Sequence, residues 1–244
     1  DQIIPFITSF STGTVHGYAG LFYIINNFLN KVNDYKDHKI AIFNGSDKGI
    51  LEIINHLIIK GVIQNEIIIL ADHTQYKFKS IKFIKNEWHV YPKNLNLTLL
   101  EKYFISNTHI APKNRICIIK NTMSDNKTGD GVVNKSALLT FCHKNKFLHL
   151  EPSITDEISL INFLYRCSLL VISWGTAFFK NYIYVSEKCT QIIVLVIGPN
   201  FINQYNDHFK TKNLVTKYKN ATVSYYISDT NLNIDLSKHL KVFN

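Results

Sequence analysis

Small and polar residues follow an apolar run in the second half of the chain, in Ser173–Thr176 (Ser-Trp-Gly-Thr). The run before them, Leu169–Ile172, has the composition of a buried strand, and Ala177–Ser186 is predicted to be a helix. A helix that begins directly after a strand presents main-chain N–H groups and the positive end of its dipole. Gly175 would let a phosphate approach the main chain closely. The turn is therefore predicted to bind an anion; an ordinary helix cap is the alternative.

Two other predicted strands end in residues that could serve the same site. Lys120 and Asn121 follow the run Arg115–Ile119, and Glu151 follows Phe147–Leu150. Ligands of open α/β sheets bind beyond the carboxyl ends of the strands. Lys120 could neutralise a diphosphate there, with a plain surface lysine as the alternative. Glu151 would present its carboxylate to the same crevice.

The first half offers a second set of candidates. Ser11–Gly20 (STGTVHGYAG) is rich in small residues, contains His16 and leads into a predicted helix. A loop that holds a histidine at a helix start is a candidate acceptor-side or catalytic element. Asp47 lies in the turn after the predicted strand Lys39–Phe43. The simplest interpretation of Asp47 is a first-turn helix acid.

The sequence predicts no metal site. The four cysteines lie 22 to 25 residues apart, so CxxC spacing is absent. Buried free thiols are expected instead, which favours a reducing compartment and a cytoplasmic location. No signal peptide is visible, and no apolar run approaches the roughly 18–20 residues of a membrane helix, so no membrane segment is expected.

The net charge of +9 invites a nucleic-acid interpretation, but the composition argues against it. Lys and Arg number 27 against 18 Asp and Glu, yet only Arg115 and Arg166 are arginines. Arginine is the usual bidentate reader of bases and phosphates, and the lysines here form no block. We therefore expect no nucleic-acid partner and only a local anion site, with a basic nucleic-acid binder as the alternative.

These candidates depend on an alternation of short β-branched runs with longer segments of helical period. The predicted strands are Lys39–Phe43, Glu66–Leu70, Arg115–Ile119, Phe147–Leu150, Leu169–Ile172 and Ile192–Ile197. The predicted helices include Tyr18–Val32, Ile50–Ile58 and Ile158–Tyr165. Nearly continuous apolar strands alternating with helices indicate an α/β fold with parallel sheets.

Three stretches depart from this alternation. Lys77–Tyr91 has a period of two and is predicted to be a meander or hairpin. The polar stretch Asn107–Asn114 suggests a boundary between an N-terminal domain, 1–112, and a C-terminal domain, 113–244. Each half would form a Rossmann-type sheet. Asn233–Phe243 is predicted to be a closing helix.

The second half also resembles a known family. Glu151–Asn181 (EPSITDEISLINFLYRCSLLVISWGTAFFKN) resembles the C-terminal signature of family 61 glycosyltransferases, which includes capsular polysaccharide enzymes. Ile116–Asn121 (ICIIKN) is similar to a family strand that ends in Arg, here Lys120. Gly20–Val32 is similar to the family helix of the acceptor side. The family loop has a His where this chain has Trp174.

The resemblance implies a compact GT-B-like fold, two Rossmann-like domains facing a cleft. A nucleotide sugar, with UDP favoured, would bind the second domain as substrate, and no cofactor or metal would be needed. The diphosphate would lie at Ser173–Thr176 near Lys120, and Asn181 matches the Asn of the following family helix. The base of the nucleotide would lie near His149–Pro152.

The same resemblance implies an inverting transfer to a glycan or protein-linked acceptor, for which one general base must deprotonate the acceptor hydroxyl. The candidates for that base are His16 first, then Glu151, then Asp47. The alternatives are an inactive relative that binds nucleotide sugar or glycan, and another polysaccharide-modifying transferase that moves sialyl or pyruvyl groups. Trp174 in place of the family His motivates the inactive relative.

Overall fold

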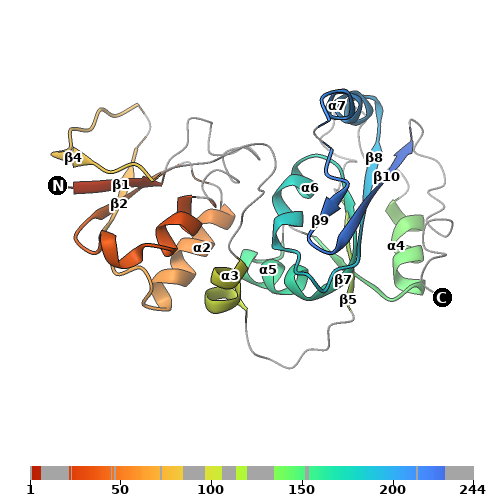
Figure 1. Cartoon of the computed structure of the whole chain (residues 1–244), viewed down its shortest axis with the longest axis horizontal. Helices are drawn as coiled ribbons and strands as arrows, with labels where there is room; N and C mark the ends of the chain where they lie inside the picture. The colour runs from red at the N-terminus through yellow and green to blue at the C-terminus, as the bar shows by residue number, and fades with distance from the viewer. Residues whose placement is uncertain are drawn as a thin grey trace. The chain divides into compact units, whose positions relative to one another are not determined.

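The computed structural model describes most of the chain as two compact units. The described residues are 2–6, 22, 24–44, 46, 48–71, 73–84, 97–105, 114–119, 135–151, 154–212 and 214–228. Unit 1 comprises Asp1–Thr108 with two later segments, Thr155–Asn162 and Tyr182–Tyr184; unit 2 comprises His109–Ile154, Phe163–Asn181 and Val185–Asn244. Figure 1 shows the mixed α/β character of both. The predicted division at 112/113 would assign the two later segments to the second domain, whereas they group with unit 1. The division therefore stays a prediction.

Unit 1 is built on a parallel sheet in the order β3-β2-β1-β4. Its strands are β1 (Gln2–Phe6), β2 (Lys39–Phe43), β3 (Ile67–Leu70) and β4 (Ser80–Ile81). The helical elements with bounds are η1 (Val32–Tyr35), α2 (Lys48–Ile59) and α3 (Leu97–Phe104), and residues 24–29 are also helical. The predicted strands over residues 39–43 and 66–70 are confirmed, as is their parallel arrangement.

Helix α2 forms where the sequence repeats apolar residues at intervals of three and four. Ile50, Ile53 and Leu57 are fully buried against the sheet side of the helix. The helix ends at Ile59, and two residues later Gly61 has a φ of +68°, which suits the left-handed turn that commonly terminates helices. The Gly61 N–H donates to the carbonyl of Ile58 over 2.8 Å.

Only residues 77–84 of the expected meander or hairpin after β3 are described, so the meander or hairpin stays a prediction. β4 pairs in parallel with β1, and the Lys82 N–H donates to the carbonyl of Ile3 over 2.8 Å. A period of two reports only that alternate residues face opposite sides, so it could not distinguish a short parallel edge strand from a hairpin. Residues 85–91 of the predicted meander lie outside the described residues.

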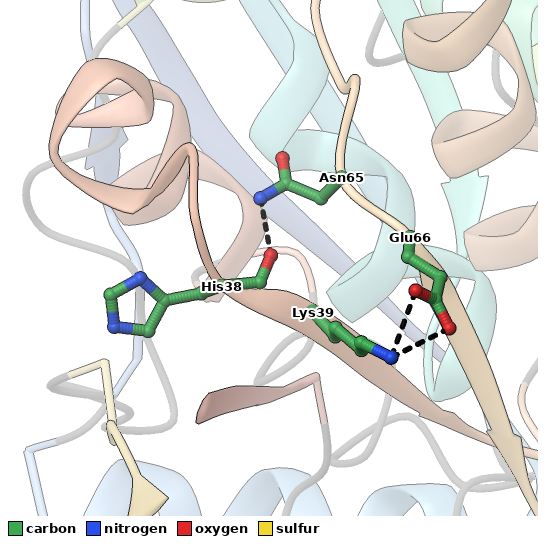
Figure 2. A network of polar contacts seen from close by, with 4 residues as sticks. All are labelled: His38, Lys39, Asn65 and Glu66. Atoms are coloured by element: carbon green, nitrogen blue, oxygen red, sulfur yellow. Dashed lines mark hydrogen bonds and ion pairs between the residues drawn. The ribbon is translucent and has the colours of Figure 1, made fainter. Parts of the chain in front are cut away.

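A polar network joins the amino ends of β2 and β3 (Figure 2). The Asn65 side-chain amide donates to the carbonyls of His38, over 2.6 Å, and Tyr35, over 2.7 Å. The Lys39 ammonium contacts both carboxylate oxygens of Glu66, at 3.0 and 2.9 Å. The His38 imidazole points away from the other three side chains. The network lies at the amino edge of the sheet, which favours a structural role because ligands of parallel sheets bind at the carboxyl edge.

We expect Asn65→Ala to lower the free energy of unfolding by about 1–2 kcal/mol, because it leaves two main-chain carbonyls without their donor. Glu66→Gln is the matched control. It should cost less than about 1 kcal/mol, because the ion pair is partly exposed, at 30% for Lys39 and 62% for Glu66. Urea unfolding followed by circular dichroism measures both. An equal cost for the two variants would contradict the role given to Asn65.

Unit 2 is built on a six-stranded sheet in the order β6-β5-β7-β8-β10-β9. Its strands are β5 (Asn114–Ile118), β6 (Phe147–Leu150), β7 (Cys167–Ser173), β8 (Gln191–Ile197), β9 (Lys217–Tyr218) and β10 (Ala221–Ser228). All neighbouring pairs are parallel except β9–β10. The helical elements are α4 (Lys135–Lys144), α5 (Glu157–Arg166), α6 (Thr176–Asn181), η2 (Tyr182–Tyr184) and α7 (Pro199–Lys210), of which η2 and the first part of α5 group with unit 1.

Both faces of the central strands in unit 2 are covered. Figure 1 shows α4 on one face of the sheet and α6 on the other. Residues such as Val171 and Ile193 pack with Cys142 of α4 in one core cluster. Their neighbours Ile172 and Val194 point to the opposite face and are equally buried. This double burial explains why the sequence shows continuous apolar runs, and it confirms the predicted α/β class.

The strand predictions over residues 115–119, 147–150, 169–172 and 192–197 are confirmed within two residues at each end. The predicted helix over residues 177–186 is shorter, because α6 ends at Asn181 and a 3₁₀ turn follows. The predicted closing helix at residues 233–243 lies outside the described residues.

Candidate functional site

The order of the strands reverses within the unit 2 sheet. From β5 the chain runs to β6 on one side and then returns to β7 on the other side of β5. At the carboxyl edge, Ile118 of β5 is in register with Leu150 of β6 and with Ile172 of β7. The segments that leave these three strands therefore start from one row. A reversal of this kind opens a crevice between the diverging connections, and ligands bind there in open α/β sheets.

The turn between β7 and α6 is held by the main chain. The Trp174 N–H donates to the carbonyl of Leu195 over 2.9 Å, which ties the turn to β8. Gly175 has a φ of +86°, a conformation that L side chains rarely adopt. A Cβ atom at Gly175 would lie 3.2 Å from Phe201 Cζ of α7. Both the backbone conformation and the close neighbour therefore favour glycine at this position.

The Trp174 side chain is fully buried in an aromatic cluster behind the turn. Its indole N–H donates to Gln204 Oε1 of α7 over 3.2 Å. The ring contacts are Phe178, Phe179, Tyr205, His208 and Tyr225. The buried indole therefore supports the turn through its packing in the core. Only the main chain of Trp174 borders the carboxyl edge of the sheet.

Ser173 and Asn181 are also buried, each at 1% exposure. Ser173 ends β7 and is in register with Leu195. The Asn181 amide donates to the carbonyl of Ala177 over 2.7 Å, and its Oδ1 has no hydrogen-bond partner among the residues that the structure describes. Thr176 begins α6. Both buried side chains thus belong to the packing around the turn.

Glu151 directly follows β6 and is half-buried. Its carbonyl accepts a hydrogen bond from the Ile154 N–H at 3.1 Å, which begins the turn toward α5. This position borders the same edge as Ser173, since Leu150 and Ile172 flank Ile118. Four predicted residues, His16, Asp47, Lys120 and Asn121, lie outside the described residues.

Sequence reasoning missed a second glycine turn at this edge. Gly198 follows β8 with a φ of +102°, and its N–H donates to the carbonyl of Ser228 at the end of β10 over 3.1 Å. Pro199 then occupies the first turn of α7. The signal was present in the dipeptide Gly-Pro after an apolar run, because proline at the first helical position marks a helix start.

Two titratable side chains around these helices have shifted pKa values. Burial lowers the pKa of His208, and the Asp207 carboxylate offsets this only in part, so the neutral imidazole is favoured. Burial raises the pKa of Asp156, but hydrogen bonds from Ser159 outweigh it and hold the pKa below its ordinary value. Asp156 caps α5 through a 2.8 Å bond from the Ser159 N–H, as expected for an acid at a helix start.

Within the described part of the chain, His, Cys, Asp and Glu side chains form no group of three that could hold a metal ion. Nor does any helix in that part have both the length and the apolar character to cross a bilayer. Compared with known proteins, the chain matches no protein-family model and no curated protein sequence.

Proposed function

We propose that the protein is a glycosyltransferase that moves a sugar from a nucleotide-sugar donor to a glycan or protein-linked acceptor, with inversion and without a metal. The observation that carries this proposal is the reversal of strand order between β5 and β7, with the left-handed turn at Gly175 beside it. The resemblance of Glu151–Asn181 to family 61 glycosyltransferases supplies the class of donor.

The strand orders support the proposal of two Rossmann-like domains in a compact GT-B arrangement. When the short antiparallel edge strand β9 is left out, the order β6-β5-β7-β8-β10 in unit 2 equals the doubly wound order 2-1-3-4-5. The order β3-β2-β1-β4 in unit 1 equals the first four strands of the dinucleotide-binding order 3-2-1-4. Folds of this kind bind nucleotides at the carboxyl edge, which is where the candidates from β6 and β7 lie.

The proposed roles follow from those places. The donor diphosphate would bind the main chain of Gly175–Ala177, with Lys120 and Asn121 beside it, and Ser173, Trp174 and Asn181 would hold that turn in place. Preorganised main-chain dipoles and a cation would stabilise the leaving diphosphate, which is the role a metal takes in other transferases. Glu151 would contact the nucleoside or serve as general base. His16 is the first candidate for that base, and Asp47 the third.

A second candidate function is binding of nucleotide sugar without transfer. Trp174 stands where the resembled family has a loop histidine, and its side chain is 0% exposed. Residue 174 therefore contributes to core packing in this chain and cannot supply the imidazole that the family has in its loop. An enzyme would need another residue for that role, whereas a binding protein would not.

We expect UDP-sugars to raise the midpoint of thermal unfolding, and we expect the shift to persist in EDTA. A screen of UDP-, GDP- and CMP-sugars measures this. Release of free sugar or of the nucleoside diphosphate then distinguishes the transferase from the binding protein. The absence of a shift with every nucleotide sugar would contradict both functions.

A charge placed in the first turn of α6 tests the site itself. Ala177→Asp should weaken UDP-sugar binding about tenfold or more, because the carboxylate repels the diphosphate. The folded state should survive, since a carboxylate near a helix N-terminus is favourable. Thr222→Asp is the matched control, because it adds the same charge at an exposed position near the amino end of β10 in the same sheet. Isothermal titration calorimetry measures both, and equal affinities would refute the site.

A further inference from the structure

Cys167 and Cys189 lie close together in unit 2, Cys167 at the start of β7 and Cys189 two residues before β8. Leu169 of β7 is in register with Gln191 of β8. Cys167 and Cys189 each lie two residues before this pair, at a place where β7 is irregular, because Asn114 of β5 pairs with Cys167 and the next residue, Arg115, pairs with Leu169. The Thr190 N–H donates to the carbonyl of Ser168 over 2.9 Å, so the residues next to the two cysteines are in main-chain contact. Neighbouring strands lie about 5 Å apart, which is within the Cα–Cα range that a disulfide spans.

The two sulfur atoms already interact. The Cys189 thiol donates to the carbonyl of Gln191 over 3.2 Å. Side-chain hydrogen bonding between the two thiols lowers the pKa of Cys189 and raises that of Cys167. The nearby Lys219 ammonium adds to the lowering of the Cys189 pKa and offsets only a small part of the rise at Cys167. Cys189 is thus the thiol favoured as thiolate, and the thiolate is the form that attacks oxidants and disulfides.

The surroundings of Cys189 also offer a way in for an oxidant. Both cysteines are buried, but Cys189 lies in a turn in which Glu187, Lys188 and Thr190 are all exposed. Local opening of this turn would expose the sulfur without separating the central strands, and it requires only that bonds such as that from the Asn220 amide to the carbonyl of Glu187, at 3.1 Å, are broken.

The other cysteine pair makes a natural comparison. Cys117 of β5 and Cys142 of α4 interact in the same way, and their hydrogen bond raises the pKa of Cys117 and lowers that of Cys142. Both belong to the core cluster between the sheet and α4, together with Phe147 and Val171. Exposure of this pair requires the helix to leave the sheet, which disrupts the core of unit 2.

We propose that Cys167 and Cys189 form a redox modification site, which a peroxide converts into a disulfide between β7 and the turn before β8. The Cys189 thiolate attacks a peroxide oxygen, the O–O bond breaks, and the leaving hydroxide takes up a proton as water. The resulting sulfenic acid is then attacked by the Cys167 sulfur. The S–O bond breaks, and hydroxide leaves as water with the Cys167 proton. Two thiols lose two electrons, and hydrogen peroxide is reduced to two waters.

The disulfide would cross-link the start of β7, the strand that leads to Gly175, to the turn before β8. β7 begins at Cys167 and ends at Ser173, just before the glycine turn. The closed loop would also contain α6 and η2. The cross-link should therefore limit the freedom of the unfolded chain and stabilise unit 2.

Treatment of the full chain with hydrogen peroxide tests the proposal, followed by alkylation and non-reducing peptide mapping. We expect the four free thiols to fall to two, with one cross-linked peptide pair that joins Cys167 to Cys189. The midpoint of thermal unfolding should rise by about 5–10 °C and return after dithiothreitol. Unchanged thiols, or a cross-link that includes Cys117 or Cys142, would overturn the assignment.

Two variants separate this site from general thiol oxidation. Cys189→Ser should lose both the cross-link and the thermal shift. Cys142→Ser removes a buried thiol from the comparison pair and should keep both. Should Cys189→Ser fail to fold, Cys167→Ala removes the same cross-link. A thermal shift that survives in either variant lacking one of the proposed pair would also overturn the proposal.

Discussion

Gly175→Ala should lower the free energy of unfolding by about 2–3 kcal/mol. The φ of +86° at Gly175 accounts for about 1–2 kcal/mol, because an L side chain is strained in that conformation. The rest comes from Phe201, whose ring carbons would lie 3.2 and 3.3 Å from the added Cβ. Urea unfolding followed by circular dichroism measures the loss.

Gly61 provides the matched control. Its φ is +68°, but nothing lies within 4 Å of a Cβ added there. Gly61→Ala should therefore cost only about 1 kcal/mol, from the backbone conformation alone. In a Phe201→Leu background the cost of Gly175→Ala should fall toward the same value, since the ring that it meets is gone. Equal costs for Gly61→Ala and Gly175→Ala in the original background would show that Phe201 does not restrict the turn.

The structural role of Gly175 also decides which variant can test the proposed donor site. A substitution at Gly175 disturbs both the fold and the turn, so weaker nucleotide binding by Gly175→Ala would have two explanations. Ala177→Asp avoids this, because Ala177 lies inside α6 and contributes a carbonyl, not its side chain, to the bond with Asn181. Ala177→Asp therefore tests where the diphosphate binds, and Gly175→Ala tests what stabilises the turn.

The sequence predicted the central strands of both sheets because strands that are buried on both faces consist almost entirely of apolar residues. β8 is apolar at nearly every position, and its residues are covered on both faces. β10 was missed because it mixes polar residues and tyrosines, as in Ala221–Ser228 (ATVSYYIS). β1 was missed because Pro5 interrupts it, although Pro5 is paired with Ala41 inside the sheet. Tertiary pairing outweighed local composition in both strands.

The candidate site was predictable in outline and not in detail. A strand followed by Ser-Trp-Gly-Thr marks a turn at a sheet edge, and β7 and α6 place it there. The sequence did not reveal that the Trp174 side chain points into the core, because its partner Gln204 lies 30 residues later on a helix that was not predicted. In the same way, the cysteine spacing excluded CxxC motifs but could not show that Cys167 and Cys189 meet, since register between strands is set by the whole sheet.

Trp174→Ala should be the most destabilising single change in unit 2, at about 3–5 kcal/mol. The indole is 0% exposed and packs against residues of α6, α7 and β10. Its removal would leave a large cavity directly behind the Gly175 turn. Trp174→Phe keeps most of the buried ring and loses the bond to Gln204, so it should cost about 1–2 kcal/mol. Urea unfolding followed by circular dichroism is the measurement, because the substitution itself removes a fluorophore.

The matched control lies on α7, in the same aromatic region. Phe209 stacks on Tyr205 but is 65% exposed, so Phe209→Ala should cost less than about 1 kcal/mol. If Trp174 acts only through packing, Trp174→Phe should bind UDP-sugars within about threefold of the original chain, because the main chain of the turn stays in place. A tenfold loss of affinity in Trp174→Phe, with stability intact, would instead assign the indole itself to the ligand. The affinity of Trp174→Phe therefore shows whether Trp174 positions the turn or contacts the donor. Because the side chain is buried, we expect that it positions the turn.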